Sequence, residues 1–176
     1  MAEIIRRKQK QYKNVLYVIS DEPYNKLVYN NQKLPSILNI FNNSIIVNSF
    51  SKSLALPGER IGYIAANPNC EDLDLMMDGF IFANRTLGFV NAPALFQKVI
   101  GNALDVRVDI DEYRKKRDIL YSHMAKLGFQ CTKPQGAFYL FPKSPIDNDV
   151  EFINHAIKYN ILLVPGQGFG YPGYFR

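Results

Sequence analysis

Residues 49–62, SFSKSLALPGERIG, combine two hydroxyls, a lysine and an arginine around a Pro-Gly turn. The hydroxyls of Ser49 and Ser51 and the guanidinium of Arg60 are groups that can hold a phosphate dianion through charge-assisted hydrogen bonds. A lysine that lies among other cations and is partly removed from water loses affinity for its proton. The neutral amine of Lys52 could then attack an aldehyde and form an imine. The alternative is a serine-rich loop with an exposed lysine, and the complete string favours the chemical interpretation.

A second group of polar residues, Ser20 to Tyr24, directly follows the apolar run 15–19. The carboxyl end of a parallel strand borders the crevice in which open α/β sheets bind their ligands. Asp21 would place an acid at the mouth of that crevice, and Tyr24 could point into the same space because Pro23 turns the chain. Acidic residues also end strands in many proteins, so an ordinary strand end is the alternative.

Position by position, residues 49–62 resemble the lysine-attachment signature of class I/II aminotransferases of fold type I, the pyridoxal-phosphate-dependent enzymes similar to aspartate aminotransferase. The Asp-x-x-Tyr pattern at 21–24 resembles the cofactor-ring motif of the same family. Three further segments fit the family: residues 136–139, 165–170 and 173–176. The resemblance covers essentially the whole chain. It implies the C-terminal portion of such an enzyme, a fragment, because the family carries a long N-terminal half that this sequence lacks.

The resemblance implies a role for each matching residue. Lys52 would form the Schiff base with pyridoxal 5'-phosphate and then act as general base and acid in the proton shift. Asp21 would pair with the pyridinium nitrogen and keep the ring protonated, and Tyr24 would donate to the ring 3-oxygen. Arg176 would clamp the substrate α-carboxylate. The cofactor phosphate would be bound by three residues of the string: Ser49, Ser51 and Arg60.

The elements that must position these residues predict an α/β fold. Short apolar runs bounded by polar residues are typical of strands buried on both faces of a parallel sheet. Three such runs occur, at residues 15–19, 44–48 and 61–66. Helices are expected at residues 3–12, 70–83 and 92–105.

After residue 106 the order of the expected helices and extended segments changes to an α+β pattern, which is typical of a smaller second domain. Helices are expected at 109–127, which Gly128 would stop, and at 149–159. Short extended segments are expected at 129–132, 137–141 and 161–164. The sequence therefore predicts that residues 1–106 are part of the large cofactor-binding domain and that residues 107–176 form a truncated small C-terminal domain.

Composition excludes several other classes of protein. The chain has 176 residues, 47% of them hydrophobic and 21% charged, which is typical of a globular protein. The net charge of +5 is spread over separate helices and no nucleic-acid-binding module is present, so a nucleic-acid partner is not expected. No apolar run is long enough for a membrane span, and no signal peptide is evident, so a cytoplasmic location is expected. The cysteines and histidines are isolated, and no metal site is predicted.

The expected reaction is transfer of an amino group between an amino acid and a 2-oxo acid, by a homodimer in the full-length enzyme. The fragment alone is expected to be inactive. Two alternatives stay open: a pyridoxal-phosphate-dependent C–S β-lyase built on the same scaffold, and a non-catalytic truncated module kept for binding. The amino-donor specificity is not fixed by these residues.

Overall fold

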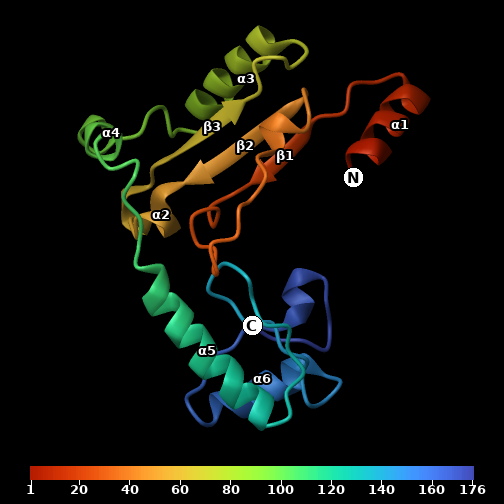
Figure 1. Cartoon of the computed structure of the whole chain (residues 1–176), viewed down its shortest axis with the longest axis vertical. Helices are drawn as coiled ribbons and strands as arrows, with labels where there is room; N and C mark the ends of the chain where they lie inside the picture. Colours follow the sequence, from red (N-terminus) through yellow and green to blue (C-terminus); the bar gives the residue numbers. More distant parts are fainter. The chain divides into compact units, whose positions relative to one another are not determined.

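The computed structural model describes the whole chain, residues 1–176, which divides into two compact units (Figure 1). The first unit comprises residues 1–26 and 32–108, and the second comprises residues 27–31 and 109–176. The sequence placed a boundary near residue 106, and the segment 27–31 was not expected in the second unit. The assignment of residues 1–106 and 107–176 to the large and small domains of an aminotransferase stays a prediction.

A three-stranded sheet forms the centre of the first unit, with β2 between β1 and β3 (Figure 1). β1 runs parallel to β2, and β3 runs antiparallel to it. The elements of this unit are α1 (Ala2–Tyr12), β1 (Val18–Asp21), η1 (Ile37–Asn39), β2 (Ser44–Ser49), α2 (Phe50–Ser53), η2 (Pro57–Glu59), β3 (Gly62–Ala66), α3 (Leu73–Thr86) and α4 (Ala94–Gly101).

The expectation of three parallel strands, each buried on both faces, was wrong for two of the runs. In the run 61–66 the strand β3 pairs antiparallel, because the chain reverses after β2, where the Phe50 amide donates to the Ile61 carbonyl at 3.1 Å. Residues 62–64, the first three of β3, are exposed. The run 15–19 contributes only its end to β1, in which Ile19 is 66% exposed. β1 is an edge strand, and its alternating burial shows that one face only is covered.

β2 is the central strand and contributes two residues to the core of the first unit. Ile45 and Ile46 are buried there, and burial of a side chain of this size contributes about 1.5–3 kcal/mol. The buried amide of Asn67 donates to the carbonyls of Leu38 at 2.6 Å and Phe41 at 3.0 Å. These bonds tie the end of β3 to η1 and satisfy a buried polar group.

The second unit contains α5 (Ile110–Lys126), α6 (Asp149–Ile157) and η3 (Gly166–Phe169). α5 begins where the Asp109 carboxylate accepts from two backbone amides of the first turn, as an N-cap residue does. It ends before Gly128, which has a φ of +85° and so adopts the left-handed conformation that glycine favours. Leu27 and Tyr29 are the most deeply buried large side chains, each 1% exposed. Their burial explains why residues 27–31 belong to this unit.

The three extended segments expected in the second unit do not form strands. Its β-type pairings are isolated bridges, which join Val28 to Gly136, Lys143 to Tyr174 and Pro165 to Phe175. Pro142 and Pro165 stand within this region, and proline has no amide hydrogen to donate to a ladder. The segments are therefore extended, but their pairing stops after one bridge.

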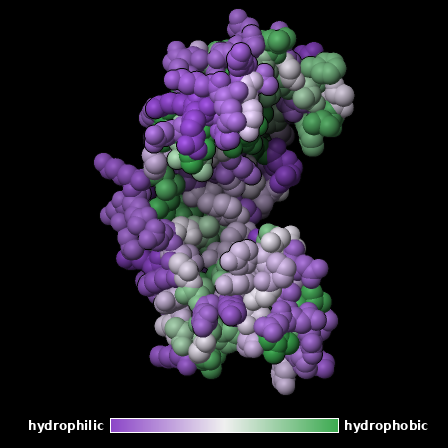
Figure 2. All heavy atoms as spheres, turned by 90° about the vertical axis from the view of Figure 1, so that its right-hand side faces the viewer, coloured by the Kyte–Doolittle hydropathy of each residue, from purple (hydrophilic) through white to green (hydrophobic).

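None of the helices is long and apolar enough to span a membrane. On the face of the chain that Figure 2 shows, hydrophobic groups gather in separate patches among hydrophilic ones.

Candidate active site

The carboxyl ends of β1 and β2 bring two predicted residues to one edge of the sheet. In the parallel register Asp21 lies opposite Val47, two positions before Ser49 at the end of β2. The amide of Glu22 continues this pairing by donating to the Val47 carbonyl at 2.8 Å. Asp21 is exposed at this edge. The sequence therefore correctly placed an acid and the lysine string at the ends of neighbouring strands.

Lys52 lies in α2, a single helical turn that follows β2 without a linker. Ser49 is the last extended residue, and its amide donates to the side-chain oxygen of Asn48 at 2.7 Å. The buried Ser53 carbonyl accepts from the Val108 amide at 3.0 Å, so the end of the turn is also fixed. Lys52 itself is half-buried. The turn holds the lysine backbone at the carboxyl edge of the sheet.

The hydroxyls of Ser49 and Ser51 are not used for hydrogen bonding within the chain. Ser49 does not cap α2 with its side chain, and neither the Ser49 nor the Ser51 hydroxyl makes a hydrogen bond within the chain. Both residues are half-buried. No buried side-chain oxygen of the chain lacks a partner, so both hydroxyls reach the solvent, from which a ligand could approach them.

Arg60 is exposed and closes the turn after η2 in the left-handed conformation, with a φ of 50°. Its Nη1 donates to the Pro57 carbonyl at 2.7 Å, which leaves further guanidinium donors for an anion. The neighbouring Phe50–Ile61 hydrogen bond holds the returning chain beside the first residue of α2. Ser49, Ser51, Lys52 and Arg60 are therefore brought into one loop region.

β3 supports this region through a close approach that requires glycine. Gly62 pairs with Ser49, and a Cβ atom on Gly62 would lie 2.4 Å from the Asn48 carbonyl oxygen. The next residue, Tyr63, accepts a hydrogen bond at its hydroxyl from the Asn48 side chain at 3.3 Å. Its ring contacts that of Phe50, with 5.8 Å between the centroids. The sequence motif included Gly62 but did not reveal the roles of Asn48 and Tyr63, which depend on strand pairing.

Tyr24 lies in the turn that follows β1. The Asn25 amide donates to the Glu22 carbonyl at 3.2 Å, which closes the turn around Pro23 and Tyr24. Tyr24 is half-buried. The turn that was expected at Pro23 is thus present, directly after β1.

Arg176 belongs to the second unit. Its guanidinium carbon lies 4.3 Å from the centroid of the Tyr139 ring and 4.4 Å from that of the Phe169 ring. Both distances are within the range of cation–π contacts. The sequence singled out Arg176 and the segments that contain both aromatic residues, but it gave no signal that the rings would flank the guanidinium.

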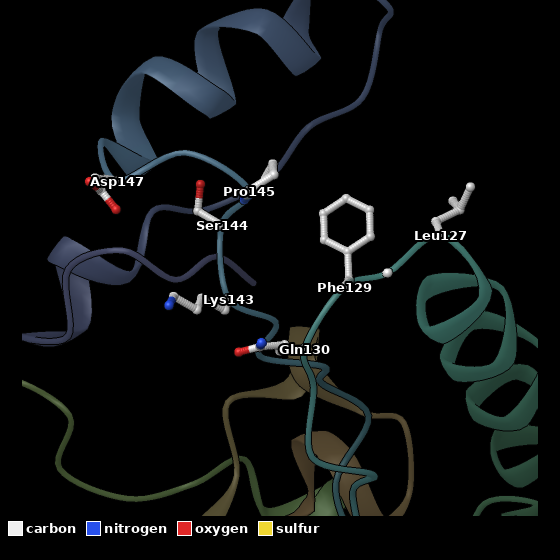
Figure 3. Close-up of a pocket in the computed structure, with 8 residues that line it drawn as sticks. Leu127, Phe129, Gln130, Lys143, Ser144, Pro145 and Asp147 are labelled. Atoms are coloured by element: carbon white, nitrogen blue, oxygen red, sulfur yellow. The ribbon is translucent and has the colours of Figure 1, made fainter.

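A hollow of about 260 Å³ lies elsewhere in the second unit, where the chain leaves α5 and approaches α6 (Figure 3). Its labelled side chains include the polar Gln130, Lys143, Ser144 and Asp147. None of the predicted site residues lines it.

Comparison with known proteins identifies the family. Residues 3–176 match the model of the family "Aminotransferase class I and II". The chain is 34% identical to a probable aspartate aminotransferase of Methanocaldococcus jannaschii over 90% of its own length and 43% of that protein. It is 35% identical to an aspartate aminotransferase of Sulfolobus acidocaldarius over 88% of this chain and 40% of that protein. The chain belongs to the class I and II aminotransferase family, and the resemblance inferred from residues 49–62 is confirmed.

Solved structures confirm the fold class. An amino transferase from Eubacterium rectale matches 99% of this chain and 44% of its own with a TM-score of 0.95 and 38% identity. The aspartate aminotransferase of Thermotoga maritima matches 99% of this chain and 45% of its own with a TM-score of 0.79 and 29% identity. The chain spans less than half of the length of these relatives.

Proposed function

We propose that this chain is the part of a pyridoxal-phosphate-dependent aminotransferase that carries the cofactor lysine. The reaction is transfer of an amino group between an amino acid and a 2-oxo acid. The observation that supports this most is the single turn α2, which holds Lys52 at the carboxyl edge of the sheet beside two hydroxyls that make no hydrogen bond within the chain. Asp21 ends the neighbouring parallel strand at the same edge. Membership of the family supplies the reaction class.

The residues present fit pyridoxal 5'-phosphate by their chemistry. The ε-amino group of Lys52 would hold the aldehyde carbon, and the Asp21 carboxylate would pair with the ring nitrogen. Tyr24 would donate to the ring oxygen. The phosphate would be held by three residues with available donors: Ser49, Ser51 and Arg60. When bound, the cofactor supplies an electron-withdrawing ring that stabilises negative charge on the substrate carbon.

The remaining work falls to the side chains of this chain. Lys52 Nζ would take the proton from the substrate α-carbon as general base and would then deliver a proton as general acid. The Asp21 carboxylate would favour a protonated ring nitrogen through a charge-assisted hydrogen bond. The Arg176 guanidinium binds the substrate α-carboxylate, whose two oxygens match its paired N–H donors. The whole enzyme would be a cytoplasmic homodimer.

Turnover tests this proposal in a chimaera that joins the N-terminal part of the Eubacterium rectale relative to residues 1–176. The assay follows formation of a 2-oxo acid from an amino acid in the presence of pyridoxal phosphate. We expect activity in the chimaera, none in its Lys52→Ala variant and unchanged activity in Lys115→Ala, which removes an exposed lysine from α5. Retained turnover in Lys52→Ala would refute the proposal. The 176-residue chain alone should show negligible turnover, because it spans less than half of its relatives.

A further inference from the structure

Two aromatic rings, those of Tyr139 and Phe169, contact the Arg176 guanidinium. Tyr139 and Phe169 lie at 4.3 and 4.4 Å from its carbon atom. The rings pack against other partners, Tyr139 against Phe138 at 4.7 Å and Phe169 against Phe141 at 6.0 Å. A cation–π contact engages the charge of the guanidinium and uses none of its N–H groups as hydrogen-bond donors to an oxygen atom, so these donors remain available to an anion. None of the ion pairs in the chain uses them.

Backbone hydrogen bonds fix the two segments that carry Arg176 and Phe169. Arg176 and Val164 exchange two hydrogen bonds, of 2.8 and 3.0 Å. The Gly166 amide donates to the Tyr174 carbonyl at 2.7 Å. A Cβ atom on Gly166 would lie 2.3 Å from the Tyr171 carbonyl oxygen, so only glycine permits this approach. The turn that bears Phe169 is therefore held against the segment that ends in Arg176.

A buried carboxylate, that of Asp149, also holds this turn. Asp149 is 3% exposed and is the first residue of α6. Its Oδ2 accepts from the Gln167 amide, within η3, at 2.8 Å. A helix N-terminus is a favourable place for a carboxylate, so Asp149 can be buried and still anchor η3. Two residues further on, Phe169 reaches Arg176.

We propose that Tyr139 and Phe169 are positioning residues, which hold the Arg176 guanidinium so that its in-plane donors meet a carboxylate, and that Asp149 holds Phe169 in place. This inference rests on the proposed role of Arg176 in binding the substrate α-carboxylate. The rings themselves need not touch the substrate. Without Phe169 the guanidinium would keep its charge but would have to be ordered at each binding event, which weakens binding.

The test uses the 176-residue chain labelled with ¹⁵N and 2-oxoglutarate as the carboxylate probe. The Nε–H signal of Arg176, assigned by its loss in Arg176→Lys, reports both ring currents and binding. We expect Phe169→Leu to shift this signal in the free protein and to raise the Kd for 2-oxoglutarate roughly three- to thirtyfold, as loss of a cation–π contact implies. The matched control Tyr171→Leu removes an exposed ring of the same turn that does not contact Arg176, and it should change neither.

The outcomes distinguish the positioning role of Phe169 from the proposed carboxylate-binding role of Arg176. If Arg176→Lys weakens binding but Phe169→Leu leaves the Kd unchanged, the positioning inference is wrong and the role of Arg176 stands. If Tyr171→Leu weakens binding as much as Phe169→Leu, the effect is general to the turn and the inference is again wrong. If Arg176→Lys leaves the Kd unchanged, Arg176 does not bind the carboxylate, and both fail. As a second line, Asp149→Asn should reproduce part of the Phe169→Leu shift, whereas Asp147→Asn, in the preceding loop, should not.

Discussion

Replacement of Gly62 by alanine should destabilise the pairing of β2 and β3 and so disturb the candidate site that follows β2. Gly62 pairs with Ser49 where β2 ends and α2 begins. A Cβ atom at this position would lie 2.4 Å from the Asn48 carbonyl oxygen and 3.2 Å from the Cα and Cβ atoms of Ser49. Since ordinary contacts begin at 3.4 Å, β2 and β3 must separate by about 1 Å at this end.

The magnitude follows from two contributions. An extra methyl group in a tightly packed place costs about 1–3 kcal/mol. Separation of the strands also weakens the 3.1 Å hydrogen bond from the Phe50 amide to the Ile61 carbonyl, which contributes about 1 kcal/mol. We expect a loss of about 3 kcal/mol for Gly62→Ala, or roughly 6–12 °C in Tm for a chain of this size.

Thermal unfolding followed by circular dichroism measures this loss, and the affinity for pyridoxal phosphate, followed by absorbance, measures its effect on the site. The control is Gly58→Ala, in the same connection, where a Cβ atom would meet nothing within 4 Å. It should change stability by less than about 0.5 kcal/mol. Equal Tm values for the two variants would refute the steric argument. A low Tm with unchanged cofactor affinity would show that β3 does not position the site.

Three further predictions concern the second unit. Gly166→Ala should lower Tm by several degrees, because the added Cβ atom would lie 2.3 and 2.8 Å from two backbone oxygens. Gly168→Ala should leave Tm unchanged, because a Cβ atom there would meet nothing within 4 Å. Differential scanning calorimetry of both variants tests this. Arg117→Leu should cost about 2–4 kcal/mol in urea unfolding, because the Arg117 side chain is only 6% exposed and donates to a backbone carbonyl and a carboxylate. A loss below about 0.5 kcal/mol, the level of a surface ion pair, would contradict this. The pKa of the Asp118 carboxyl is lowered, first by a hydrogen bond from Lys133. Its stabilising effect is therefore present above the ordinary pKa of 3.8 and is lost as the pH falls through the lower folded pKa. Asp118→Asn should lower Tm at pH 7, with a difference that shrinks below about pH 4; a difference that is independent of pH would contradict it.

Two elements could be predicted from residues within or next to them, a capped helix and a short apolar strand. The helix expected at 109–127 is α5, because Asp109 caps its start and Gly128 takes a positive φ after its end. The strand expected at 44–48 is β2, which is buried by neighbours on either side. In both cases the information lies within a few residues of the element.

Features that depend on distant partners could not be predicted. Nothing near Tyr29 indicates that its hydroxyl donates to the Ala137 carbonyl at 2.5 Å, or that the Arg117 guanidinium lies 4.1 Å from its ring. Because of these contacts, residues 27–31 pack with the second unit. The direction of β3 was missed for the same reason, because the apolar run 61–66 is compatible with either direction of pairing.

In the candidate site, too, the features within one sequence motif could be predicted, and those that depend on distant partners could not. The motif at 49–62 located Lys52, the two hydroxyls and Arg60, since they stand in one connected loop. It did not indicate that Gly62 is needed for a close approach to Asn48, which exists only after β2 and β3 pair. The rings beside Arg176 come from segments about 30 residues apart in the sequence, so no local pattern joined them. The roles of the predicted residues toward cofactor and substrate stay predictions.

The most direct test of the central claim is to find the lysine that binds the cofactor. The purified chain is incubated with pyridoxal phosphate, reduced with borohydride, digested and mapped by mass spectrometry. Our account predicts label confined to the peptide that contains Lys52, and none in Lys52→Ala. Label spread over surface lysines, or label that persists in Lys52→Ala, would contradict the claim that α2 presents the cofactor lysine.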